Sequence, residues 1–278
     1  MTLEIGPVAR SAGRRVWSVA PEHPDRGALS GVDASLYRDP DGRLTLQAGD
    51  DARLTVSADR RRILMRPPLD AVQLQLVASI ALPLAVADRS LLVLHAAAVA
   101  TQGRAVIIAG VRGAGKSSSL VGLTDAGWSP VSEDVCVLEQ VSGGVWVWPG
   151  PPWVRRHDGE PGPVGSAKLF AGGGKSAWDI TARRPIEPVP VERLVVLEPP
   201  DGSAPRWQPV DRPVVVEVLA EHAVWLGDQA ERGRGLFSPL LQLTGQVPVA
   251  QLRLPSSADW LEVLAVELRR GVASSDTS

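Results

Sequence analysis

The sequence is poor in cysteine: only one, Cys136, stands among its 278 residues. A single cysteine excludes disulfide bonds within the chain, and this scarcity is typical of proteins in a reducing compartment. We therefore expect a cytoplasmic location. Cys136 stands in an apolar, alternating stretch, which favours a place in the core over a reactive thiol.

An excess of one charge is also missing. Lysine and arginine together number 29, aspartate and glutamate 31, and the net charge is −2. This balance gives no electrostatic reason to expect nucleic acid or an anionic membrane as a partner. The basic cluster Arg60-Arg61-Arg62 has no interleaved aromatic residues, so we interpret it as the solvated edge of a strand.

Long apolar runs are missing as well. The apolar stretch 74–87 is interrupted by Pro83, contains Gln75 and Ser79, and is too short for a membrane span. The N-terminus lacks the basic and then apolar layout of a secretory signal. The composition, 44% apolar and 22% charged, is that of ordinary soluble globular proteins, and the length suits one large domain or two small ones.

The most specific pattern that is present lies in residues 104–117. The apolar run 105–109 predicts a buried strand, and a helix-like stretch over 118–125 follows and stops at Gly127. Between them, Gly110-Val-Arg-Gly-Ala-Gly-Lys-Ser117 fits G-x-x-x-x-G-K-[ST] at every fixed position. Strand, glycine-rich loop and helix is the context that this phosphate-binding motif requires.

The residue types of this loop suit a nucleoside triphosphate with Mg²⁺. Glycine lets backbone N–H groups approach an anion closely, and the helix after the loop adds the positive end of its dipole. Lys116 can reach the β- and γ-phosphates, and the Ser117 hydroxyl can bind Mg²⁺. The alternative is a glycine-rich turn that binds nothing. The residues expected to contact phosphate are Gly110, Val111, Arg112, Gly113, Ala114, Gly115, Lys116, Ser117 and Ser118.

Three further residues are candidates for the site. Asp134 follows Lys116 by 18 positions on the next predicted strand, with Glu133 beside it, and His95 precedes Lys116 by 21 positions. An acidic residue on a strand next to the loop can reach Mg²⁺ or a hydroxyl aligned with the γ-phosphate. Strand alternation puts Glu133 and Asp134 on opposite faces. The alternatives are a solvated acidic pair at a hairpin edge and, for His95, a core histidine.

The rest of the chain divides into a small antiparallel β region, 1–67, and a nucleotide-binding domain, 68–273. Within the first, residues 1–30 are weakly patterned, and we expect loop or a poorly ordered arm at Arg14-Arg15 and from Pro21 to Arg26. Residues 35–67 are expected to form a β-meander. A helix is expected from Pro67-Pro68 through Ile80. Further expected elements are strands at 91–100 and 191–198, a hairpin over 131–148, a strand at 214–218, a helix at 260–268 capped by Ser256 or Ser257, and a disordered tail, 274–278.

Residues 149–186 are rich in Gly, Pro and Arg and show little periodicity, so we expect a long loop that is a lid, a binding loop or disordered. Lys175, after Gly172-Gly-Gly174, either closes on the γ-phosphate or on an acidic group of the acceptor, or belongs to a plain surface turn. Two kinds of side chain in or near this loop leave alternatives open. Arginines 155, 156, 183 and 184 either grip an acidic acceptor or lie in solvent, and tryptophans 146, 148, 153 and 178 either stack on an acceptor or fill the core.

Over residues 90–138 the chain resembles the kinase domain of HPr kinase/phosphorylase. The similar segments are Leu94-His-Ala-Ala-Ala-Val99, the loop 110–117, Gly127 and Ser132-Glu-Asp-Val135. The chain looks still more like the shorter bacterial relatives encoded with peptide natural products, including lasso-peptide precursor kinases. The resemblance implies an α/β fold with a P-loop kinase domain of the HPr kinase type. It makes Asp134 the acceptor of the substrate hydroxyl's proton, Lys116 the phosphate-binding lysine, Ser117 a Mg²⁺ ligand and His95 an active-site histidine.

The chain departs from this family at three places. In the loop, Val111-Arg112 stands where the family usually has Ser or Asp-Ser, and Arg112 either helps to neutralise phosphate charge or lies exposed. Glu133 stands where the family has the first aspartate of a pair, and we expect it to serve as a metal ligand. The Glu-Ile-Arg-Gly element, with which the bifunctional enzymes bind metal and the HPr protein, is missing, and the surroundings of Glu160 do not match it. Recognition of HPr and the reverse phosphorylase activity are therefore not expected.

Together these features predict an ATP- and Mg²⁺-dependent kinase. The expected acceptor is a Ser or Thr hydroxyl of a peptide or small protein in natural-product biosynthesis. One alternative is a small-molecule kinase that acts on a sugar, amino acid or nucleoside. Another is a nucleotide-binding regulator without catalysis, which the substitution at Glu133 and the missing element favour. Assembly into a homo-oligomer is an expectation from the resemblance alone.

Overall fold

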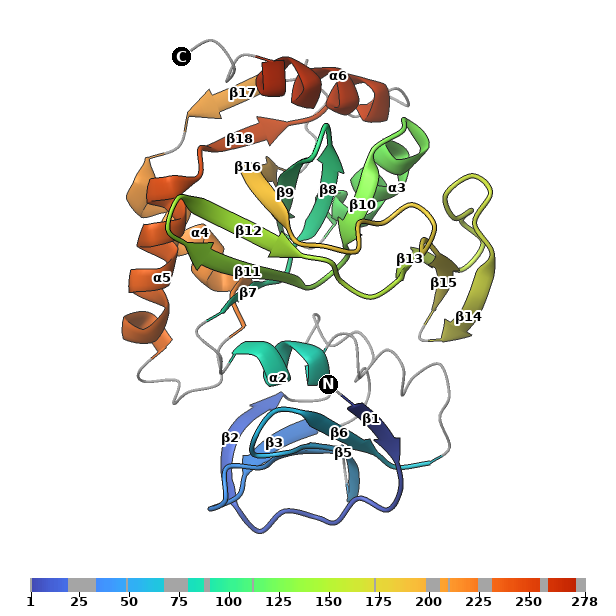
Figure 1. Cartoon of the computed structure of the whole chain (residues 1–278), viewed down its shortest axis with the longest axis vertical. Coiled ribbons are helices and arrows are strands. Elements are labelled where there is room, and N and C mark those ends of the chain that lie inside the picture. Colours follow the sequence, from blue (N-terminus) through green and yellow to red (C-terminus); the bar gives the residue numbers. More distant parts are fainter. Residues whose placement is uncertain are drawn as a thin grey trace. The chain divides into compact units, whose positions relative to one another are not determined.

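The structure is a computed structural model of the whole chain (Figure 1). It describes residues 2–19, 34–48, 50–67, 80–87, 91–111, 113–172, 174–198, 206–209, 211–224, 232–255 and 260–273. The chain divides into two compact units. Unit 1 consists of Met1–Leu91, Ala171–Gly174 and Val224–Gly235, and unit 2 of Leu92–Phe170, Lys175–Ala223 and Leu236–Ser278.

Unit 1 contains a six-stranded sheet in the order β1-β6-β5-β4-β3-β2. The meander expected over 35–67 is confirmed, because β3, β4, β5 and β6 each pair antiparallel with the next strand along the chain. The loop or arm expected at Arg14-Arg15 is wrong, since β2 begins there, and Pro21 to Arg26 lie outside the described residues. Two strands, β1 and β2, form in residues 2–19, and β1 pairs with β6 in parallel. Their partners are remote in sequence, which local patterns do not reveal. The strands are β1 (Thr2–Ile5), β2 (Arg14–Val19), β3 (Ala34–Arg38), β4 (Leu44–Ala48), β5 (Asp51–Val56) and β6 (Arg62–Met65).

One face of this sheet forms a core with the short helix α2 (Leu82–Ala87). The helix side contributes Ala81 and Ala85, both fully buried. The strands contribute alternating large apolar side chains, as a sheet with one buried face requires. These are Leu36, Leu44, Leu46, Leu54, Val56, Ile63 and Met65.

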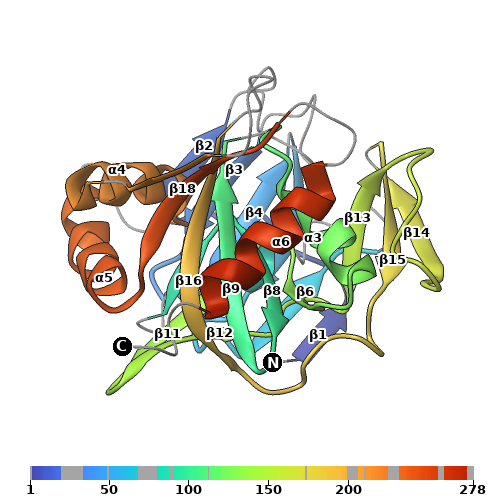
Figure 2. The same cartoon turned by 90° about the horizontal axis from the view of Figure 1, so that it is seen from above.

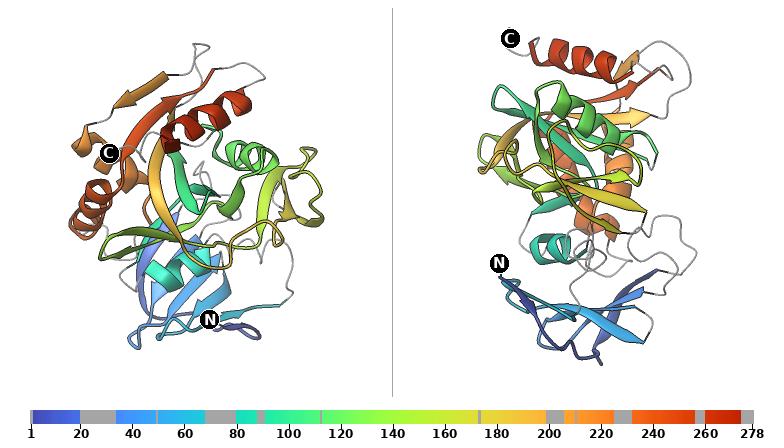
Figure 3. Two further views of the ribbon diagram at one scale, coloured as in Figure 1. Left: turned by 45° about the horizontal axis from the view of Figure 1, so that its top comes forward. Right: turned by 90° about the vertical axis from the view of Figure 1, so that its right-hand side faces the viewer.

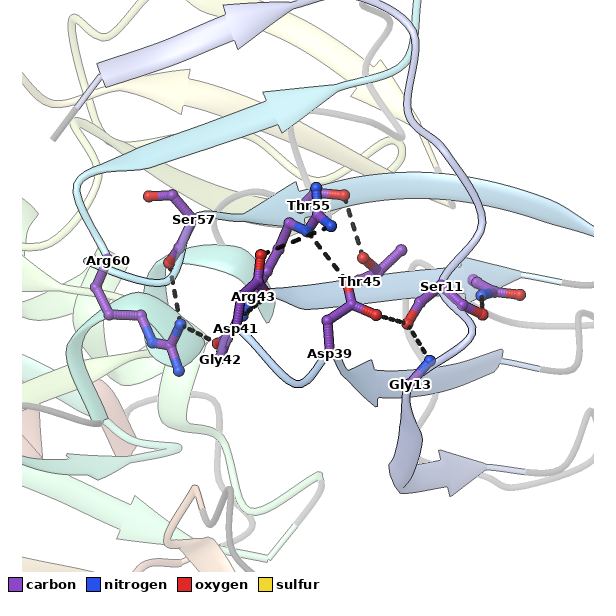
Figure 4. A network of polar contacts seen from close by, with 11 residues as sticks. Ser11, Gly13, Asp39, Asp41, Gly42, Arg43, Thr45, Thr55, Ser57 and Arg60 are labelled. Atoms are coloured by element: carbon purple, nitrogen blue, oxygen red, sulfur yellow. Dashed lines mark hydrogen bonds and ion pairs between the residues drawn. The ribbon is translucent and has the colours of Figure 1, made fainter.

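Polar contacts tie the turns of this sheet together (Figure 4). Arg60 has a left-handed backbone, with φ of 58°, and its guanidinium donates to Gly42 O at 2.8 Å and Ser57 O at 3.0 Å. Thr45 and Thr55 pair their hydroxyls across β4 and β5 at 3.3 Å. Arg60 is therefore a buried brace between two turns, and its interpretation as part of a solvated basic edge is wrong.

The described residues of unit 2 form a nine-stranded mixed sheet in the order β10-β8-β9-β16-β12-β11-β7, with β18 paired to β16 and β17 to β18. β16 runs parallel to β9 and to β18, and the other pairs are antiparallel. The strands are β7 (Leu92–Leu94), β8 (Ala97–Thr101), β9 (Arg104–Gly110), β10 (Ser129–Ser132), β11 (Cys136–Val141), β12 (Gly144–Trp148), β16 (Val189–Glu198), β17 (Arg206–Pro209) and β18 (Val249–Arg253).

Helices α3 (Lys116–Asp125) and α6 (Trp260–Ala273) lie together on this sheet (Figure 2). They share one core cluster with β8, β9, β16 and β18. Two further helices, α4 (Arg212–His222) and α5 (Arg232–Gln246), lie side by side (Figure 3), and Arg212 Nε donates to Thr244 O at 3.4 Å. The helices predicted at 118–125 and 260–268 and the strands at 105–109 and 191–198 are confirmed.

The strand predicted at 214–218 is wrong, because this segment belongs to α4. Its four valines favour a strand by local preference. Pro213 stands in the first turn of the helix, where its fixed φ fits. One side of the helix is buried, through Val215, Val216 and Leu219. This packing overrides the local preference of valine for a strand.

Two runs that the pattern predicts as single strands are each broken in the middle. The run 91–100 divides into β7 and β8 at His95-Ala96, and 131–138 divides into β10 and β11 at Glu133–Val135. Asp134 has φ of 63°, a left-handed conformation that aspartate tolerates better than most residues. The alternation argument that put Glu133 and Asp134 on opposite faces of a strand is therefore wrong.

The segment 149–186 contains a three-stranded sheet in the order β13-β15-β14, so its interpretation as a long loop is wrong. The strands are β13 (Trp153–His157), β14 (Lys168–Gly172) and β15 (Lys175–Asp179). Val154 on β13 and Ala177 on β15 are buried, and Arg155 pairs in register with Ala177. That the segment acts as a lid stays a prediction.

Several expectations fall outside the described residues: the helix over 68–79, the caps at Ser256 and Ser257, and the tail 274–278. The predicted boundary at residue 67 borders such a segment and stays a prediction. Among the helices in the described part of the chain, none is long and apolar enough to cross a membrane.

Candidate functional site

The sheet of unit 2 brings the predicted site residues to one of its ends. β9 ends at Gly110, where the glycine-rich loop 110–115 begins. β8 runs antiparallel to β9, with Ala97 opposite Ile108, so the bend at His95 lies at this same end. β10 runs antiparallel to β8, with Ser132 opposite Ala98, so the bend at Glu133–Val135 lies there too. Topology, and not sequence proximity, gathers these segments.

The backbone of the glycine-rich loop depends on its glycines. Gly113 and Gly115 have φ of 83° and 95°, which L-residues with a side chain rarely adopt. At Gly110 a Cβ atom would lie 2.6 Å from the backbone oxygen of Leu197 on the neighbouring β16. The loop passes too close to β16 for any other residue. Arg112, one of the expected phosphate contacts, lies outside the described residues.

Lys116 extends back over this loop. Its Nζ donates to Gly110 O at 2.6 Å and to Val111 O at 3.2 Å. These contacts keep the ammonium group beside the loop, and its charge raises the local attraction for an anion. Ala114 N–H donates to Val111 O at 3.1 Å and closes the turn. The loop residues Val111 and Gly113 are exposed, whereas Ala114 is buried.

The first turn of α3 presents hydroxyl groups and open backbone donors. Gly115 occupies the N-cap position, and no side chain caps the helix there. The first backbone N–H groups of an uncapped helix are a ready site for an anion. Ser119 Oγ donates back to Gly115 O at 2.8 Å, whereas Ser118 Oγ accepts from Arg156 Nη1 at 2.9 Å. Ser117 lies close enough to Glu133 for its hydroxyl to lower the pKa of that carboxyl.

Glu133 is buried, with 6% of its surface exposed. Burial raises the pKa of its carboxyl above the ordinary value, and the charges of Arg155 and Lys175 partly oppose that rise. Oε2 accepts a hydrogen bond from the backbone N–H of Arg155. Oε1 is buried and has no hydrogen-bond partner among the described residues. The interpretation of this carboxyl as a solvated edge charge is wrong.

An orphaned carboxylate oxygen beside a serine hydroxyl fits Mg²⁺. Within the described residues no three His, Cys, Asp or Glu side chains converge on one point. Mg²⁺ suits such a sparse set, because it is usually held by one or two carboxylates together with water and substrate phosphates. Ser117 and Glu133, the two expected metal ligands, are thus brought together by the fold.

Asp134 is the partner of a buried arginine. Its carboxylate forms an ion pair with Arg155 Nη2, and the two side chains are 18% and 10% exposed. Burial lowers the pKa of the Arg155 guanidinium, and the Glu133 carboxylate raises it again. The other terminal nitrogen, Nη1, is buried without a hydrogen-bond partner in the described structure. One arginine therefore contacts both acidic residues of the bend.

His95 is exposed, so the interpretation as a core histidine is wrong. Its backbone N–H donates to His222 O at 2.6 Å, which fixes the bend between β7 and β8. Cys136, in contrast, is fully buried as expected, and its thiol contacts Ala96 O at 3.4 Å across the same two bends.

The remaining candidates lie in three places: the site, the core and the exposed face of β12. Arg155 and Arg156 belong to the site, and Lys175 influences Glu133. The pairing of β13 with β15 and the packing of β13 against α3 bring them there, and neither is visible in the sequence. Trp178 packs against the core, and Trp153 meets Phe170 edge to face at 5.6 Å. Trp146 and Trp148 are exposed on β12.

No family model matches the chain, and no curated protein matches it. Among solved structures it is similar to the Hpr(Ser) kinase/phosphatase from Coxiella burnetii, with a TM-score of 0.38 and 14% identity. The similarity covers 66% of this chain and 98% of that chain. A similarity at this level assigns no role to any residue of this chain.

Proposed function

We propose that unit 2 is a kinase that binds ATP with Mg²⁺ and transfers the γ-phosphoryl group to a hydroxyl. The observation that carries the proposal is one arrangement at the end of the sheet. A glycine-rich loop with its lysine leads into an uncapped helix, and the buried Glu133 meets the hydroxyl of Ser117 beside it. Asp134 comes directly after Glu133 on the same bend, with 18% of its side chain exposed.

The loop and helix supply the anion site. Backbone N–H groups of residues 113 and 115–118 bind the phosphates, and Lys116 moves its ammonium from the carbonyls of residues 110 and 111 onto them. Arg156, already at Ser118, adds a second cation. Ser117 and Glu133 hold Mg²⁺, which neutralises phosphate charge when bound.

Asp134 acts as the proton acceptor. Its carboxylate takes the proton of the acceptor hydroxyl as the hydroxyl oxygen bonds to phosphorus and the bond to ADP breaks. We propose a Ser or Thr side chain of a peptide or small protein as this acceptor. The exposed His95, at the same end of the sheet, lines the approach of the acceptor.

A nucleotide-binding regulator without catalysis is the second candidate. One observation favours it: the Asp134 carboxylate is engaged by Arg155 in the ion pair described above. In such a regulator this pair would persist when nucleotide is bound, and no proton would be taken up.

Turnover and binding measured side by side on the full-length protein test these two functions. We expect Lys116→Ala to lose both ATP binding and phosphate transfer, and Asp134→Ala to keep binding while transfer falls about 100-fold or more. Arg104→Ala, at the far end of β9, is the matched control and should change neither. Mass spectrometry of candidate precursor peptides and of a metabolite set identifies the acceptor. A wild-type protein that binds nucleotide but modifies nothing and hydrolyses nothing is the regulator.

A further inference from the structure

Arg155 holds an unusual position among the charged residues of unit 2. It lies in the middle of β13, where it is 8% exposed, between the buried Val154 and the half-buried Arg156. Its backbone N–H donates to Glu133 Oε2, and its Nη2 donates to Asp134 Oδ2. Both acidic residues of the bend are thus held by one residue from a different sheet.

Two polar atoms in this cluster remain without partners in the described structure: Arg155 Nη1 and Glu133 Oε1. Leaving a charged donor or acceptor buried and unpaired is costly, so such atoms call for a ligand. One is a cationic donor and the other an anionic acceptor. A phosphoryl group with its divalent cation is a ligand that satisfies both, because phosphoryl oxygens accept from guanidinium and the cation binds carboxylate.

The position of β13 next to the helix α3 supports this ligand. The neighbouring Arg156 donates to Ser118 Oγ in the first turn of α3, at 2.9 Å. Arg155 is therefore adjacent in sequence to a residue that contacts the first turn of α3, the turn that we propose binds the phosphates. β13 also pairs along its whole length with β15, which fixes the backbone of Arg155 and leaves the guanidinium as the part that can move.

We propose that Arg155 is a catalytic residue that binds the γ-phosphoryl group, exchanging its ion pair with Asp134 for the phosphoryl oxygens when nucleotide binds. This rests on the proposed function. The exchange gives a role to both partners of the ion pair. The planar guanidinium of Arg155 neutralises charge on the group being transferred, and the Asp134 carboxylate becomes free to accept a proton. Burial lowers the pKa of the Arg155 guanidinium, but arginine is not deprotonated in proteins, so the group remains a cation.

The competing explanation is that Arg155 only braces the bend at Glu133–Val135. A brace affects every ligand of the site alike, whereas a γ-phosphoryl contact affects only ligands that carry a γ-phosphoryl group. Comparison of ADP with a non-hydrolysable ATP analogue separates the two, and it needs no activity measurement.

The experiment is calorimetric titration of the full-length protein with ADP and with the β,γ-imido analogue of ATP, both with Mg²⁺. We expect Arg155→Ala to weaken the analogue at least tenfold and ADP less than twofold. Arg155→Lys, which keeps the charge without the planar fork, should show a smaller loss in the same sense. Arg104→Ala is the control and should match the wild type for both ligands.

The possible results separate this inference from the proposed function. If the wild type binds neither ligand, the proposed function is wrong. If the wild type binds both, but the ratio of the two affinities is unchanged in Arg155→Lys and Arg155→Ala, Arg155 is a brace and the inference is overturned. Should Arg155→Ala fail to fold, the affinity ratio of Arg155→Lys decides.

Discussion

The carboxyl group of Glu133 lies in a buried environment beside one arginine and one lysine, and burial dominates its titration. Its pKa is raised above the ordinary value of 4.5, so the folded state holds this proton more tightly than the unfolded chain does. A raised carboxyl pKa makes stability fall as pH rises, because the unfolded state releases the proton first.

From this we predict the behaviour of Glu133→Gln. Below about pH 4.5 the Glu133 carboxyl is protonated in both the folded and the unfolded wild type, so there is no charge whose removal could stabilise the variant. As pH rises above that value, the wild type loses stability and the variant does not, so their difference in unfolding free energy grows in favour of the variant. The slope stays below about 1.4 kcal/mol per pH unit. Urea unfolding at several pH values between 4.5 and 8 measures it, and a pH-independent difference would contradict the prediction.

Gly110 and Gly113 differ in what surrounds them. At Gly110 a Cβ would lie 2.6 Å from the Leu197 backbone oxygen, whereas at Gly113 no atom lies within 4 Å. We predict that Gly110→Ala costs about 1–3 kcal/mol of stability through overpacking and displaces β9 from β16. Gly113→Ala is the control and carries only the backbone cost of about 1 kcal/mol. Equal losses in denaturant unfolding would show that the close approach to β16 is unimportant.

At the scale of elements, helices α3 and α6 meet at Gly122. A Cβ at this position would lie 2.6 and 2.7 Å from the two methyl carbons of Leu261. Arg269 Nη2 adds a hydrogen bond to Ala126 O at 3.0 Å, so the helices are joined at both places. The absence of a side chain at residue 122 lets α6 approach α3 closely.

A double-mutant cycle tests this contact. Alanine in place of helical glycine gains about 1 kcal/mol by propensity. In the wild type we expect the clash with Leu261 to cancel or reverse that gain, and in the Leu261→Ala background Gly122→Ala should become stabilising. Additive effects in thermal or denaturant unfolding would mean that the two residues are not coupled.

The elements that the sequence predicts well are those that depend on patterns among residues close together in the chain. The strand, glycine-rich loop and helix at 104–125 are predicted by periodicity and glycine spacing alone. The segment 149–186 is not, because its strands are short and their pairing, such as Arg155 opposite Ala177, is tertiary. For the same reason Glu133, Asp134 and Ser117 could be proposed from their spacing, whereas the contact of Arg155 with both acids could not.

At the scale of the whole molecule, each unit has a core of its own. The unit 1 core joins strands β3, β4, β5 and β6 to α2, and the unit 2 core joins α3 and α6 to β8, β9, β16 and β18. The glycine-rich loop, Glu133 and Asp134 all belong to unit 2. A ligand of this site should therefore stabilise one unit in preference to the other.

Hydrogen exchange measured with and without nucleotide tests this expectation. At 100 times its dissociation constant a ligand stabilises the state that binds it by about 2.7 kcal/mol. With Mg²⁺ and the β,γ-imido analogue we expect slower exchange over 110–125 and 133–157. Strands β3–β6 should exchange at an unchanged rate. Equal protection in both units would indicate that they unfold together.

The buried Cys136 also has a practical consequence. Its burial raises the pKa of the thiol far above the ordinary range, so in the folded protein it is shielded from alkylating reagents. A cysteine introduced at the exposed Val111 would then be the single accessible attachment point for a maleimide dye. Fluorescence from that position can report the arrival of a nucleotide in real time, in a chain that is otherwise native.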